Sequence, residues 1–116
     1  MRELLIAVPT QGSEGMRDVV ANVFSKAPTF TYLNVVNGKV EGVDVEENTV
    51  SKLKQGTGPM VAKNLRDRGV DAVITGELGP GASTLLDMSG IRAISVEPGT
   101  RVSKALKRAL GQLESP

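Results

Sequence analysis

The chain has 116 residues, a mass of 12.2 kDa and a formal net charge of +1, and it contains neither cysteine nor histidine. This length is typical of a single domain, here residues 1–116, and it allows a hydrophobic core without disulfide support. The missing residue types exclude disulfides, metal held by thiolate or imidazole, and any catalytic triad with a histidine base.

Charge and aromatic content also limit the partners. A balanced charge offers no strong basic patch for a phosphate backbone, and two Phe, one Tyr and no Trp leave few rings to stack on bases. The longest apolar run, residues 4–9, is too short to span a membrane or to form the core of a secretory signal. We therefore expect a cytoplasmic protein that contacts neither nucleic acid nor membrane.

The first half of the chain predicts strands and one helix. Residues 4–8 are a continuous apolar run ended by Pro9, which indicates a strand buried on both faces. Turn-forming residues follow, and helical apolar spacing then predicts a short helix over residues 16–24. Residues 30–36 and 40–45 are rich in strand formers and flank Asn37-Gly38, which predicts an antiparallel hairpin.

The second half is a tandem repeat of helix and strand with a period of about 21 residues. The predicted elements are a helix over 59–68, a strand over 72–74, a helix over 80–88 and a strand over 93–96. Each helix has a proline in its first turn and a glycine after its last. A final amphipathic helix is expected over 101–113. Met16, Met60 and Met88 are expected to pack in the core.

The element order is therefore β-α-β-β-α-β-α-β-α. Tandem helix–strand units are laid down most simply as parallel crossovers on one side of the first strand, with the hairpin on its other side. This predicts an α/β, three-layer, ribonuclease-H-like fold. Its five-stranded mixed sheet has the order 3-2-1-4-5, with strand 2 antiparallel.

A ligand site is expected where the strand order reverses, beyond the carboxyl ends of strands one and four. Two predicted helices begin there, and their free backbone N–H groups would face a bound anion. The candidate ligand-binding residues are Thr10, Gln11, Gly12, Gly56, Thr57, Gly58, Gly76, Glu77, Gly79 and Gly81. The alternative is that these glycines serve only the geometry of the turns.

The sequence does not favour an enzyme. Neither glycine-rich loop ends in Gly-Lys-Ser/Thr, and no Gly-x-Gly-x-x-Gly follows the first strand. A two-metal nuclease needs carboxylates gathered on the strands. The acidic residues that come into question are better explained as solvated charges: Asp44, Glu46, Glu47, Glu77 and Glu97. We expect no catalytic residue and no metal ligand.

Several motifs, in this order, resemble the dinitrogenase iron–molybdenum cofactor biosynthesis family. They are the stretches 24–30, 56–62, 69–76 and 79–82, followed by Gly90-Ile91. The resemblance covers nearly the whole chain. It implies a ribonuclease-H-like domain that carries a metallocluster or its precursor, with cluster-assembly or acceptor proteins as partners.

The chain departs from the family pattern at the positions where relatives place histidine. Val23 precedes Phe24, and Lys54-Gln55 precede the second motif. The resemblance therefore implies an iron–sulfur or iron–molybdenum cluster held without Cys or His, by backbone N–H groups and Lys26. The leading hypothesis is a non-enzymatic carrier of a small anionic ligand. The alternative is a regulatory or adaptor domain that uses the same scaffold for protein contacts.

Overall fold

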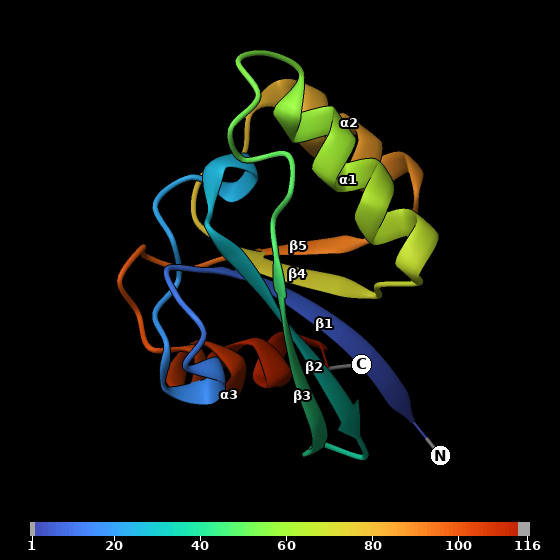
Figure 1. The fold of residues 1–116 in the computed structure, drawn as a ribbon. Helices are drawn as coiled ribbons and strands as arrows, with labels where there is room; N and C mark the ends of the chain where they lie inside the picture. The colour runs from blue at the N-terminus through green and yellow to red at the C-terminus, as the bar shows by residue number, and fades with distance from the viewer. Residues whose placement is uncertain (1, 114–116) are drawn as a thin grey trace.

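The computed structural model describes residues 2–113, which form one five-stranded sheet in the order β3-β2-β1-β4-β5 (Figure 1). The strands are β1 (Glu3–Thr10), β2 (Thr29–Val36), β3 (Lys39–Glu47), β4 (Ala72–Thr75) and β5 (Arg92–Ser95). β2 is antiparallel to β1 and β3, whereas β4 is parallel to β1 and β5. The predicted strand order and the antiparallel strand 2 are confirmed. The expected domain, 1–116, includes residues 1 and 114–116, which lie outside the described residues.

Helices cover both faces of the sheet. Figure 1 shows α1 (Thr57–Arg68) and α2 (Pro80–Met88) together on one side and α3 (Val102–Leu113) on the other. β1 lies between the two layers, so Ile6 and Val8 pack in the core against α3 while Ala7 packs in the core against α1 and α2. None of these three side chains is exposed, which confirms a strand buried on both faces.

The hairpin between β2 and β3 turns at the predicted Asn37-Gly38. Both residues have positive φ, 51° and 82°, and Val36 pairs with Lys39 across the turn. Positive φ at both central positions is the type I′ geometry that suits the twist of paired strands.

The prediction of a helix over residues 16–24 is wrong. The segment contains two short 3-10 turns, η1 (Gly15–Arg17) and η2 (Phe24–Lys26), joined by extended chain. The Asp18 carboxylate accepts hydrogen bonds from the N–H groups of Gly12, Glu14 and Val19, which fixes the chain in a non-helical path. Val20 then pairs with Thr10 and is fully buried, as suits a β-branched residue in extended backbone.

Met16 packs against the core as expected. The expectation that Met60 and Met88 also pack there is wrong, since they are 42% and 78% exposed. The buried stripe of α1 runs through Val61 and Leu65, and Met60 lies about 100° from it around the helix. Met88 comes two residues after the buried Leu86 and therefore faces away from the core. No helix among residues 2–113 is long and apolar enough to cross a membrane.

Candidate anion-binding site

The first turns of α1 and α2 lie against each other because both carry glycine at the point of contact. A Cβ on Gly58 would lie 3.3 Å from the Cβ of Ala82, and a Cβ on Gly81 would lie 3.2 Å from the Cγ of Pro59. Such distances are shorter than ordinary side-chain contacts, so larger residues would push the helices apart. The two glycines thus bring two helix N-termini side by side.

Neither N-terminus is capped by a side chain, and neither first turn contains an acidic residue. Pro59 and Pro80 have no N–H, and the N–H groups of Met60 and Ser83 bond to backbone carbonyls of the same helix start. Within the described part of the chain, four N–H groups are left without a partner: those of Thr57, Gly58, Gly81 and Ala82. The positive ends of two helix dipoles therefore lie together, with no acidic residue in either first turn.

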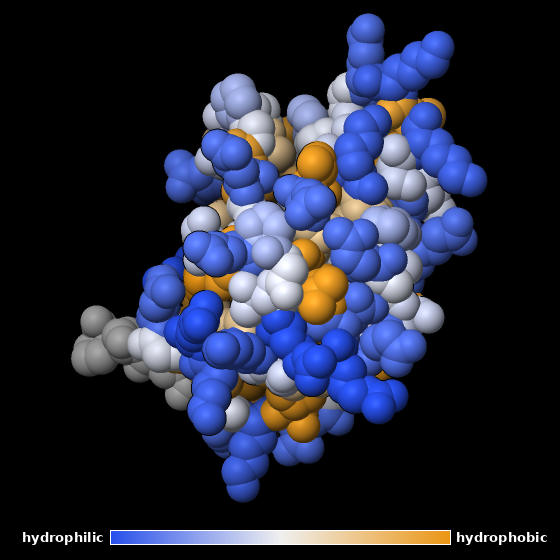
Figure 2. All heavy atoms as spheres, turned by 90° about the vertical axis from the view of Figure 1, so that its left-hand side faces the viewer, coloured by the Kyte–Doolittle hydropathy of each residue, from blue (hydrophilic) through white to orange (hydrophobic). Residues whose placement is uncertain are grey.

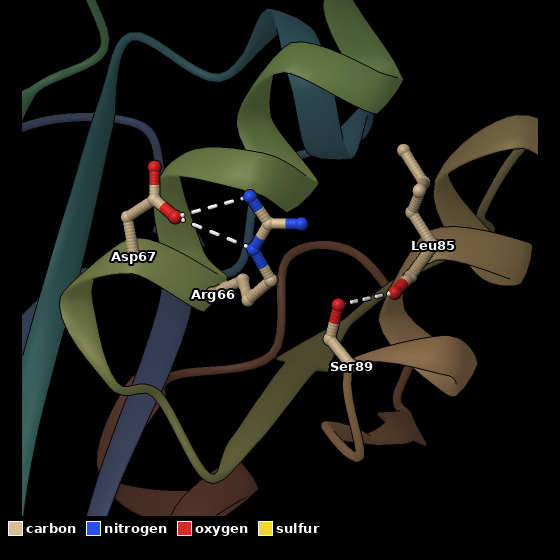
Figure 3. A network of polar contacts seen from close by, with 4 residues as sticks. All are labelled: Arg66, Asp67, Leu85 and Ser89. Carbon is tan, nitrogen blue, oxygen red and sulfur yellow. Dashed lines mark hydrogen bonds and ion pairs between the residues drawn. The ribbon is translucent and has the colours of Figure 1, made fainter.

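At the opposite ends of the same helices, backbone carbonyls of the last turns accept hydrogen bonds (Figure 3). α1 ends at Gly69 in left-handed backbone, whose N–H bonds back to carbonyls of the last turn. α2 ends at Ser89, whose hydroxyl donates to the carbonyl of Leu85 at 2.7 Å. Arg66 and Asp67 form an exposed ion pair at 3.2 Å near the end of α1. Unused hydrogen-bonding capacity is thus concentrated at the N-terminal ends.

These N-termini open into a hollow of about 340 Å³ between the two helices and η2. The Thr57 hydroxyl donates to the Ser25 hydroxyl at 2.9 Å, which connects α1 with η2 on the wall of the hollow. The lining contains one cation, Lys54, and one carboxylate, Glu77. The full lining is Val23, Phe24, Ser25, Lys54, Gln55, Gly56, Thr57, Gly58, Pro59, Glu77, Gly79, Gly81 and Ala82.

A larger hollow of about 540 Å³ lies along α2 and β5. It is lined by the later turns of α2, including Asp87, and by Gly90 and Arg92. Each hollow contains one carboxylate and one cation, so the helix end distinguishes them, and the carbonyl end of α2 disfavours an anion in the larger hollow. The smaller hollow is therefore the better candidate for a negatively charged ligand.

The structure brings six of the candidate residues together around this hollow, namely Gly56, Thr57, Gly58, Glu77, Gly79 and Gly81. The other five do not line it. The buried Thr10 hydroxyl bonds to the hydroxyls of Thr29 and Thr31, and Gln11 is exposed in the following loop. The N–H of Gly12 is bound to Asp18.

Gly76 and Lys26 have other surroundings. A Cβ on Gly76 would lie 3.0 Å from the Cγ of Pro98, and Gly76 lines a separate hollow beside β5. The ammonium group of Lys26 donates to the backbone carbonyl of Leu53. Lys26 therefore supports the loop before α1, and its ammonium group has a protein partner.

The candidate residues from the sequence did not include Val23, Ser25 or Lys54, which line the hollow. Ser25 lies in the 24–30 stretch and Lys54 lies two residues before Gly56, and only the packing of η2 beside the start of α1 makes them neighbours. Val23 and Lys54 were noted in the sequence as departures from the family pattern, which gives no geometry.

The lining suits an anion held by hydrogen bonds better than a metal held by ligand bonds. Its donors are backbone N–H groups, the Ser25 hydroxyl and the Lys54 ammonium group, since the Thr57 hydroxyl already donates to Ser25, and Glu77 is the single carboxylate. Among residues 2–113 there is no group of three or more His, Cys, Asp or Glu side chains that could hold a metal ion. Soft metals prefer thiolate and imidazole, which this chain lacks.

Comparisons with known proteins agree with this architecture. The model of the family described as dinitrogenase iron-molybdenum cofactor matches residues 2–112, and the chain belongs to that family. An uncharacterized protein from Methanocaldococcus jannaschii is 27% identical over 92 residues, which cover 78% of this chain and 77% of that protein.

Solved structures with a similar fold include two that are 28% identical to this chain. The apo form of the orange protein from Desulfovibrio gigas has a TM-score of 0.82 and 28% identity, over 93% of this chain and 88% of that one. A NifB-like protein from Thermotoga has a TM-score of 0.70 and 28% identity, over 94% and 88% of the two chains. The family and these neighbours point to a small cofactor-binding or carrier protein.

Proposed function

We propose that this protein is a non-enzymatic carrier that binds a small anionic ligand between the first turns of α1 and α2. One observation carries the proposal: two adjacent helix N-termini, without side-chain caps and without acidic residues, open into the same hollow. Free N–H groups and aligned dipoles at helix starts bind anions in many proteins. Lys54 adds a full positive charge at the edge.

The ligand class that fits is an iron–molybdenum-type metallocluster or its precursor, bound as an anion. Family membership and the likeness to the orange protein support this class. Hydrogen bonds from N–H and hydroxyl groups hold the outer atoms of such an anion, with no bond from protein to metal. Release to an acceptor protein then requires no protein–metal bond to break, which suits a carrier working in the cytoplasm.

A second function, as an adaptor for protein contacts, has one observation in its favour. Gly58 and Gly81 are each explained by helix packing, since their neighbours lie within 3.3 Å of an added Cβ. Those two glycines would be needed even if no ligand bound. Gly79 differs, because a Cβ there would meet no atom within 4 Å.

Gly79 therefore provides the test. Its φ of −71° and ψ of 161° are accessible to valine, so Gly79→Val introduces no backbone strain and places a branched side chain at the edge of the hollow. We expect molybdate, sulfate or phosphate at a hundredfold excess over its dissociation constant to raise the wild-type unfolding free energy by roughly 2.7 kcal/mol. Gly79→Val should lose that increase in urea unfolding.

The control is Asp87→Asn, which changes a charge near the far end of α2 and should keep the full increase. A neutral solute, added while the ionic strength of the buffer is kept equal, should have no effect on either protein. If the anion stabilises the wild type and Gly79→Val equally, the N-termini do not bind it and the adaptor function is favoured.

A further inference from the structure

β3 forms one outer edge of the sheet, so it pairs with β2 on one side only. It is nine residues long, whereas β5 at the opposite edge has four. In Figure 1 β3 runs in front of β2, and no other strand or helix lies in front of it. Proteins commonly shorten or cover an exposed edge, because its unpaired N–H and C=O groups can pair with another chain. A long uncovered edge is therefore a candidate surface for a partner.

Hydrogen bonds beside β2 show which backbone groups of β3 are unused. The N–H of Asn48 donates to the carbonyl of Pro28, directly opposite it in the register of β3 and β2. Bonded and non-bonded residue pairs alternate along antiparallel strands, so every second residue of β3 directs its N–H and C=O groups away from β2. These outward-facing residues are Val43, Val45 and Glu47.

The side chains of β3 lie on two chemically different faces. Asp44 is paired with Tyr32, whose ring packs in the core on the side of α1 and α2, and Glu46 lies on the same face. Val43 and Val45 lie on the opposite face, and Val43 is 41% exposed. The edge therefore presents carboxylates on one face and apolar side chains on the other.

The edge also has an excess of negative charge, since β3 contains four acidic residues and one lysine. The Glu46 carboxylate pairs with Arg68, whose guanidinium lies 3.8 Å from the centroid of the Tyr32 ring. Asp44 and Glu47 are exposed and form no ion pair in the part of the chain that the structure describes. Two carboxylates beside the outward-facing backbone groups are thus available to a cationic partner.

We propose that β3 binds an extended, basic segment of a partner protein, which adds to the sheet as a further strand. An antiparallel segment exchanges backbone hydrogen bonds with Val43, Val45 and Glu47. Charge and exposure on β3 set its sequence: a basic residue opposite Asp44 and another opposite Glu47, with apolar residues opposite the two valines. The inference does not depend on anion binding, because no residue of β3 lines the hollow at the helix N-termini.

The acidic edge disfavours a second copy of this chain as the occupant. Antiparallel pairing of two β3 strands about Val45 would place Asp44 of each copy opposite Glu46 of the other, and like charges directly opposite destabilise a strand pair. Figure 2 shows hydrophobic residues on one side of the molecule only as small separate groups among hydrophilic ones. That side therefore offers no large apolar surface of the kind that permanent dimers bury.

The probe is a fluorescein-labelled peptide of sequence Ser-Lys-Thr-Val-Lys-Val-Ser. When it runs antiparallel to β3, its first lysine faces Glu47 and its second lysine faces Asp44. Fluorescence anisotropy with the 116-residue protein measures its binding. Asp44→Lys should weaken binding roughly tenfold, because an opposite charge becomes a like charge. Glu97→Lys makes a similar change of charge just after β5, at the other edge of the sheet, and should bind like the wild type.

Two further measurements separate strand addition from simple charge attraction. Methylation of the backbone nitrogen of the first valine of the peptide, which faces Val45, removes a donor to β3 and should abolish binding. The same methylation at the second lysine should leave binding intact, since that N–H faces away from β3. Peptide binding should also slow hydrogen exchange at the N–H groups of Val43, Val45 and Glu47, measured by NMR.

Each other outcome overturns the inference. A peptide that does not bind the wild type would show that this edge is not a docking surface. Binding that survives Asp44→Lys or methylation of the valine, or that leaves exchange at the three N–H groups unchanged, would place the peptide elsewhere. A doubled mass of the free protein, with slow exchange at these groups, would show that a second copy covers β3. Anion binding at the helix N-termini is measured separately and is unaffected by any of these results.

Discussion

Two threonines in neighbouring parts of the sheet are both buried but differ in their hydrogen bonds. The Thr31 hydroxyl lies 3.0 Å from that of Thr10, whereas the Thr75 hydroxyl has no partner among residues 2–113. Both residues are at most 1% exposed. A buried hydroxyl without a partner costs about 1–3 kcal/mol, and a bonded one contributes about 1 kcal/mol.

Substitution by valine should therefore have opposite effects at the two positions. Thr75→Val should raise the free energy of unfolding by about 1 kcal/mol, and Thr31→Val should lower it by a similar amount. Both changes preserve shape and β-branching, so urea unfolding reports mainly on the hydroxyl. A loss of stability in both variants would show that the Thr75 hydroxyl is bonded in solution.

Single residues also show where the sequence was informative. Gly56, Gly58, Gly79 and Gly81 could be placed at one site because each lies at the start of a predicted helix, and parallel neighbours start at the same edge of the sheet. Thr10 and Gly12 could not be excluded from the candidate site. Only the fold shows that their polar groups already form hydrogen bonds with Thr29, Thr31 and Asp18.

At the scale of elements, the close contact of α1 with α2 determines the site. Gly58→Ala should destabilise the protein by about 1–3 kcal/mol, since the added Cβ would lie 3.3 Å from that of Ala82. Gly111→Ala in α3 is the matched control, because nothing lies within 4 Å of its added Cβ. It should stabilise the protein by about 0.5–1 kcal/mol through helix propensity.

Thermal unfolding of both variants checks this pair. The Gly58 variant should also lose anion binding, because separated first turns no longer present their N–H groups to one ligand. If Gly58→Ala is as stable as the wild type and binds normally, close helix packing does not shape the site.

An element could be predicted where residues close together in the sequence determine its structure by themselves. The hairpin was predictable because Asn37-Gly38 determines the turn by itself. Residues 16–24 have helical apolar spacing, but the Asp18 carboxylate accepts local hydrogen bonds from the N–H groups of Gly12 and Glu14. The N–H of Val20 bonds to the carbonyl of Thr100, which only the fold brings near. Local side-chain bonds and tertiary contacts together override the helical pattern there.

At the scale of the whole molecule, the absence of Cys and His from the sequence has a measurable consequence. After treatment with a chelator, the purified protein should contain well under one equivalent of iron, molybdenum or zinc, because hydrogen bonds do not retain free metal ions. Mass spectrometry of the metal content checks this. Stoichiometric metal that survives chelation, with its ligands mapped to carboxylates, would contradict this prediction.

The four free N–H groups at the starts of α1 and α2 belong to the main chain, and this affects how the protein can change over generations. Replacement of a side chain cannot delete a backbone donor unless the new residue is proline. The surface residues around the hollow can therefore drift widely while the donors persist as long as the fold does. Descendants of one ancestor could differ at most lining side chains and still accept the same ligand, as long as position 79 carries no bulky side chain. Mutations that abolish binding would then concentrate at Gly58, Gly79 and Gly81, where an added side chain separates the helices or covers the donors.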